Sequence, residues 1–90
     1  MNFDWEPNPT ARPAQTANEG DTVKLKLKVS NHFYYSVLAK VFKVNAENID
    51  AQIVGITDWD DRVHLVADNV TTLIGTIVTF KPGYIHQTTP

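Results

Sequence analysis

The amino-acid sequence predicts an all-β domain, a small five-stranded barrel or roll that follows an extended N-terminal arm. Two observations predict this class. Apolar and polar residues alternate strictly over residues 22–29, and further apolar runs of strand length are separated by turn-forming residues. A chain of 90 residues, of which 42% are hydrophobic, forms one domain with a small core. We therefore expect self-association to add to its stability.

Residues 1–19 are predicted to form the extended arm. They contain three prolines among polar residues and show no apolar period. Phe3 and Trp5 are the exceptions, and two large aromatic side chains are costly to leave in water. We expect both to dock on the barrel of the same chain or on another copy, and the sequence leaves these two alternatives open.

The first strand is predicted at residues 22–29, after a turn at residues 19–21. Its apolar residues fall at alternate positions and its polar residues, three of them lysines, fall between them. A strand with this pattern buries one face and exposes the other. The buried set is Val23, Leu25, Leu27 and Val29.

The segment from Phe33 to Val44 fits both a helical and an extended pattern. Several of its apolar residues recur at helical spacing, but the segment is dominated by aromatic and β-branched residues, which favour strands. We favour a long strand. Ala39, Val41 and Val44 then face inward, with a bulge near Phe42 and Lys43 that restores the phase.

The remaining strands are predicted from alternation and from the turns that bound them. Ala51, Ile53 and Gly55 share one side of the third strand, and Gly55 is a candidate bend. Turns are expected at residues 45–48 and 58–61, and a tail at residues 87–90. The predicted strands after the first two are residues 49–56, 62–67 and 76–80.

The order of these segments resembles small SH3-like barrels of bacterial and phage proteins. The resemblance covers about residues 20–86, and it rests on the series Gly20-Asp21-x-Val23, Val37 to Val41, Ile49 to Ile56, and Leu73-Ile74-Gly75-x-x-Val78-x-Phe80-x-Pro82-x-x-Ile85. It implies an SH3-like barrel domain at residues 20–86, between the arm and the tail. It implies no activity, because those relatives have none assigned.

Charge is distributed in blocks, although the net charge is only −2. Residues 22–46 contain five lysines and no acid, whereas residues 47–72 contain six acids and one arginine. Lysines beside Tyr34 and Tyr35 would suit a small barrel that holds single-stranded nucleic acid. A solvated strand face with cross-strand charge pairing explains them at least as well. The candidate nucleic-acid-binding residues are Lys24, Lys26, Lys28, Lys40 and Lys43.

Catalysis and metal binding are not expected. Asp58, Asp60 and Asp61 lack the spacing and the glycine of a calcium loop. His32, His64 and His86 have no spacing that indicates a site, and no nucleophile or phosphate-binding motif is present. The chain has no cysteine, which excludes disulfides and thiolate metal sites. We expect no catalytic residue, no metal and no cofactor.

The nine aromatic residues are too many for the interior of so small a barrel, so some are expected at an interface. The candidates are Trp5, Tyr34, Tyr35 and Trp59. The predicted function is a non-catalytic protein-binding or self-assembly module, with a mobile element as one candidate source. Its partner is a second copy or another protein, and the nucleic-acid-binding barrel is the alternative. No membrane segment or apolar leader is seen, and a cytoplasmic location is expected.

Overall fold

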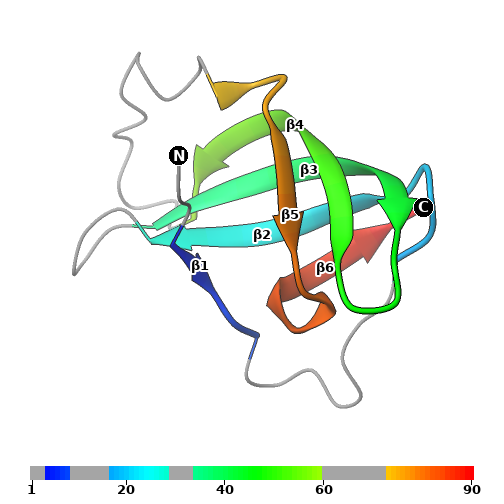
Figure 1. Cartoon of the computed structure of the whole chain (residues 1–90). Coiled ribbons are helices and arrows are strands. Elements are labelled where there is room, and N and C mark those ends of the chain that lie inside the picture. The colour runs from blue at the N-terminus through cyan, green and yellow to red at the C-terminus, as the bar shows by residue number, and fades with distance from the viewer. Residues whose placement is uncertain (1–3, 9–16, 29–33, 60–72) are drawn as a thin grey trace.

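The protein is an all-β domain built on one antiparallel sheet. The computed structural model describes residues 4–8, 17–28, 34–59 and 73–90. Within them the sheet has the order β1-β2-β3-β4-β5, and β6 pairs with β2. The strands are β1 (Trp5–Glu6), β2 (Thr22–Lys28), β3 (Tyr34–Val44), β4 (Ile49–Asp58), β5 (Ile77–Phe80) and β6 (Ile85–Thr89), and a single turn of 3-10 helix, η2 (Pro82–Tyr84), joins the last two. In Figure 1, β5 runs across the direction of β2 and β3, as expected of a strongly twisted sheet.

The alternation predicted for the first strand is confirmed in β2. Val23 and Leu25 are fully buried and Leu27 is 8% exposed, whereas Lys24 and Lys26 are partly exposed on the other side. Cross-strand pairing extends this division to β3, where Leu25 lies opposite the buried Val37. The sheet therefore has an inner face, which forms the core, and an outer face, which carries the lysines.

The segment that fitted both helix and strand is the strand β3, and the predicted bulge is present. The register with β4 shifts between Val41 and Lys43, which leaves Phe42 as the extra residue. Ala39 and Val41 are buried as predicted. The register also places Val44 on the inner face, opposite the buried Ile49, but Val44 is 45% exposed and adds little to the core. Val44 is the last residue of β3, beside the loop that leads to β4.

A second irregularity moves the phase of β4 at a place the sequence did not show. The register shifts between Leu38 and Ala39, which leaves Val54 as the extra residue. Val54, on the outer side, is 48% exposed, and the shift turns Gly55 outward and Ile56 into the core. Gly55 was expected to face inward; it is half-buried and lies opposite Leu38. β4 also continues through Asp58, where a turn was predicted. The predicted strand at residues 62–67 lies outside the described residues.

One edge of β2 is shared by the two ends of the chain. β6 pairs with the first half of β2, and β1 pairs with its second half through Trp5 opposite Leu27 and Glu6 opposite Lys26. Past β1, the backbone N–H of Asn8 donates to the carbonyl of Gly83 at 2.9 Å. Residues 87–89, predicted as a tail, belong to β6. Residues 4–8 are thus docked on their own chain.

The core lies on the inner face. Its fully buried side chains come from every strand except β1 and β5, and the largest are Leu25, Ile49, Ile53 and Ile85. Phe80 of β5 is also buried, and Trp5 packs against this cluster from the N-terminal segment. Ala17 is buried in the same cluster, so residues on both sides of the undescribed stretch 9–16 contribute to it.

Candidate functional site

Lysines and aromatic rings meet on the outer face at the end of β4. Lys24 and Lys26 come from β2, Tyr34 opens β3, and Trp59 directly follows β4. Tyr34 and Trp59 are neighbours, because the backbone N–H of Trp59 donates to the Tyr34 carbonyl at 3.1 Å. Together with the ring of His86 from β6, these residues form what we call the cation–aromatic cluster.

The two ammonium groups lie over the aromatic rings. The Lys24 Nζ is 4.6 Å from the centroid of the Trp59 ring, and the Lys26 Nζ is 4.8 Å from it. The Lys26 Nζ is also 4.3 Å from the centroid of the Tyr34 ring. All three distances are within the roughly 6 Å at which a cation is attracted by an aromatic face. The contacts hold positive charge beside flat apolar surfaces.

His86 fixes the far side of the cluster. Its Nε2 lies 3.0 Å from the carbonyl oxygen of Glu6, and because a carbonyl only accepts, Nε2 carries the proton. Its ring meets that of Trp59 edge to face, with centroids 5.1 Å apart and an interplanar angle of 72°. The N-terminal segment thereby holds His86, and His86 holds one edge of the indole.

The small residue Ser36 leaves room for this arrangement. It lies on the outer face, between Lys26 of β2 and Thr57 of β4 in the cross-strand register. Although that face carries the lysines, Ser36 is only 4% exposed. The indole of Trp59 has to pass over β3 to reach the two lysines of β2, and a large side chain at position 36 would occupy that path.

A second feature of the outer face is an exposed group of aliphatic side chains, which we call the apolar patch. Leu38 of β3, Val54 of β4 and Ile77 of β5 are 37%, 48% and 62% exposed. Leu38 leans over Gly55, since a Cβ there would lie 3.8 Å from its Cδ1. Ile77 pairs with Gln52, two residues before Val54 on the same strand. The patch therefore continues across three strands.

The four aromatic residues predicted at an interface lie on two different faces. Tyr35 is 8% exposed and belongs to the core, and Trp5 packs against that core from β1. Tyr34 and Trp59 lie on the outer face, in the cation–aromatic cluster. The sequence supplied these residues but could not separate the two pairs, because the division depends on the register of β3 against β2.

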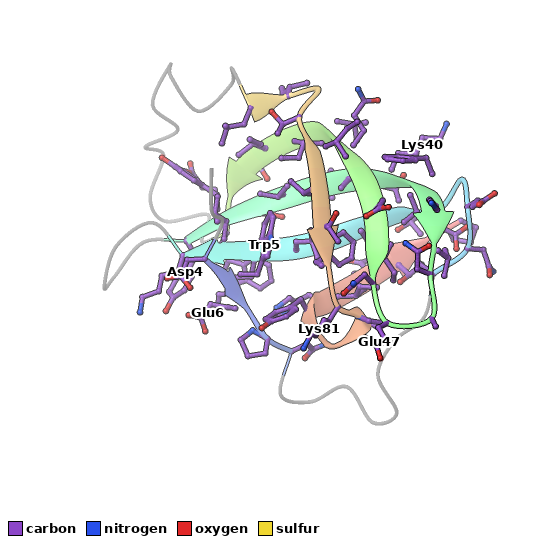
Figure 2. The ribbon with its side chains drawn as sticks, in the orientation of Figure 1. Asp4, Trp5, Glu6, Lys40, Glu47 and Lys81 are labelled. Carbon is purple, nitrogen blue, oxygen red and sulfur yellow. The ribbon has the colours of Figure 1, made fainter. Side chains whose placement is uncertain are left out.

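The five predicted lysines are divided as well. Lys24 and Lys26 are in the cluster, and Lys28 lies opposite Tyr34. Lys40 lies opposite Thr22, four residues or about 13 Å along β2 from Lys26. Figure 2 shows Lys40 at the end of the sheet away from Asp4 and Glu6. Lys43 is farther along β3, opposite Asp50.

Sequence reasoning missed the role of His86, which no local pattern could reveal, because it depends on the pairing of β6 with β2. His32, His64, Asp60 and Asp61 lie outside the described residues. Among the residues that the structure describes, no group of three metal-ligating side chains comes together. In the same part of the chain, no helix has the length and apolar character needed to cross a membrane.

Comparison of the chain with protein-family models, with curated proteins and with solved structures finds no match. The resemblance to SH3-like barrels therefore stays a prediction. The features of this chain that bear on function are the cation–aromatic cluster and the apolar patch of the outer face.

Proposed function

We propose that this protein is a non-catalytic self-assembly module, and that two copies associate through the apolar patch. The observation that carries the proposal is the exposure of Leu38, Val54 and Ile77 on one face of a small sheet. Exposed aliphatic side chains that adjoin one another are typical of protein interfaces. A domain of this size also gains a substantial fraction of its stability from any further burial.

A second copy is the occupant that the charges favour. Lys40 is beside the patch on β3, and Asp50 is beside it on β4, where it accepts a 2.6 Å hydrogen bond from the hydroxyl of Thr79. A surface that carries both signs next to an apolar centre is complementary to itself. In a two-fold contact the lysine side of one copy faces the acidic side of the other. Lys24 lies opposite Leu38 and Lys43 opposite Asp50, so a second copy would place its Asp50 among lysines of the first.

We also propose that the sheet curls toward an SH3-like barrel. The strand order supports this, because β2 to β5 form a meander and β6 returns to the first strand of that meander. The two outermost strands of this series, β5 and β6, are consecutive in the sequence and joined by the single turn η2. The expected cytoplasmic location stays a prediction.

The self-assembly proposal is tested by solution mass. We expect the chain to sediment as a dimer at micromolar concentrations, with little change between low and moderate salt because the contact is mainly apolar. Ile77→Lys places a charge on the most exposed side chain of the patch and should give a monomer. Gln87→Lys adds the same charge at an exposed position of β6 and should leave the dimer intact.

Two outcomes would contradict the proposal. One is a wild-type chain that stays monomeric at about 100 μM. The other is a dimer that Ile77→Lys leaves intact while the variant keeps the circular dichroism spectrum of the wild type, since the contact then lies elsewhere on the molecule.

A further inference from the structure

We infer that the cation–aromatic cluster binds single-stranded nucleic acid. In this assignment a base stacks on the exposed part of the Trp59 ring, and the ammonium groups of Lys24 and Lys26 bind the adjacent phosphates. The inference concerns different side chains from those of the apolar patch, although the two features adjoin where Lys24 lies opposite Leu38, and it does not depend on self-association.

The chemistry of the cluster matches this ligand in two respects. A single strand offers flat bases that stack on aromatic rings, and a phosphate next to each base. The cluster offers an indole and a phenol with two ammonium groups held 4.3–4.8 Å from the ring centroids. Lys28, opposite Tyr34 in the register, adds a third cation along the same face. Tyr34 and Trp59 are both only partly buried, so part of each ring is open to solvent.

The same geometry disfavours the other polyanions. In a duplex the base faces are already stacked on one another, so Trp59 would have no partner. An acidic peptide presents carboxylates without a flat face, so it would use the lysines alone. A single strand is the polyanion that uses both the rings and the cations.

Nearby carboxylates set the strength of the site. Asp58 precedes Trp59 but lies opposite the buried Tyr35, on the other face of the sheet. Glu6 lies opposite Lys26 in the register of β1 and β2, and Asp4 precedes it along the same edge. We therefore expect weak, salt-sensitive binding. Glu6→Gln should strengthen it, because the side-chain charge is removed while the backbone carbonyl that holds His86 is kept.

The experiment is a fluorescence-anisotropy titration of a labelled fifteen-nucleotide thymidine strand with the full chain. With three lysine contacts and a slope of about −0.7 per contact, affinity should fall roughly 20-fold between 50 and 200 mM salt. Stacking of one base is worth about 1–3 kcal/mol, so Trp59→Ala should weaken binding about 5- to 150-fold. Trp59→Phe keeps an aromatic face and should weaken it much less.

Two lysine variants separate a site from general attraction. Lys26→Gln should weaken binding and reduce the salt slope by about 0.7. Lys81→Gln removes the same charge at an exposed position before η2 and should have a smaller effect on affinity. Thermal melting of each variant, followed by circular dichroism, checks that the fold is kept.

Three results would overturn the inference. The first is a folded Trp59→Ala variant that binds the strand as tightly as the wild type. The second is equal affinity for a duplex of the same length. The third is equal competition by polyglutamate of matched charge, which would show that the lysines act as a simple anion exchanger without stacking.

Discussion

The docking of Trp5 on its own chain can be tested by removing its side chain. Complete loss of a buried tryptophan in a Trp→Ala substitution costs about 3–5 kcal/mol. Trp5 is only partly buried where it packs against the core, so we take about half of this range, or about 2 kcal/mol. The backbone pairing of Trp5 with Leu27 is available to alanine as well. For a chain of this size, 1 kcal/mol corresponds to about 4–8 °C in Tm, which gives a drop of about 8–16 °C.

The assay is thermal unfolding followed by circular dichroism at several protein concentrations. It is best done in the Ile77→Lys background, which is designed to remove the proposed dimer contact and its own concentration dependence. Because Trp5 and Leu27 belong to one chain, Tm should then be the same at 5 and at 100 μM with and without Trp5→Ala. Asp4→Ala changes an exposed residue of the same segment and should shift Tm by less than about 4 °C.

Two results would contradict the docking of Trp5 on its own chain. A drop of less than about 3 °C for Trp5→Ala would mean that the contact with the core contributes little. A Tm that rises with concentration in the Ile77→Lys background would mean that the segment docks on a neighbouring copy.

Two further predictions concern the backbone and the core. Gly20 has φ +93°, so Gly20→Ala should lower Tm by several degrees. Gly55 does not have a positive φ, and a Cβ there would meet Leu38 only at 3.8 Å, so Gly55→Ala should keep or slightly raise Tm. Equal shifts of the two variants in calorimetry would contradict this. Leu25→Ala removes a fully buried side chain and should lower the free energy of unfolding by about 2–5 kcal/mol, or Tm by at least about 8 °C. Lys28→Ala, on the outer face, should shift Tm by less than about 4 °C. Similar shifts for the two variants would show that the two faces are assigned wrongly.

The parts of the fold that a local pattern determines were predictable. The alternation over residues 22–28 required one buried face, and β2 has it. The aromatic and β-branched content of residues 34–44 favoured a strand, and the phase of its apolar residues required the bulge at Phe42. In each case the information lies within a few residues of the element.

The parts that depend on distant partners were not predictable. β1 has two residues, and the residues of β6 after Ile85 are all polar, so neither shows an apolar period. Both exist because one edge of β2 offers them hydrogen-bonding partners. The irregularity at Val54 is similar, because it depends on how β3 and β4 pair.

The candidate site shows the same division. The sequence pointed to lysines near aromatic residues, and Lys24, Lys26, Tyr34 and Trp59 do meet. It could not show that Tyr35 faces the core or that Lys40 is about 13 Å away along the strand. Successive side chains of a strand point to opposite faces, so Tyr34 and Tyr35 differ in face. The register of β3 against β2 then determines which lysines lie beside Tyr34.

The positions of the two surface features allow both proposed activities at once. The cation–aromatic cluster lies over the end of β3 that begins with Tyr34, whereas Ile77 lies in the row that contains Lys40 and Gln52. Four residues of β3, or about 13 Å, separate Ser36 from Lys40. Leu38 is the patch residue nearest the cluster, since it lies opposite Lys24, so a contact formed mainly through Val54 and Ile77 would leave both Trp59 rings uncovered. Such a dimer presents two stacking sites to one long strand, so self-assembly would raise the affinity for nucleic acid by avidity without any change within either site.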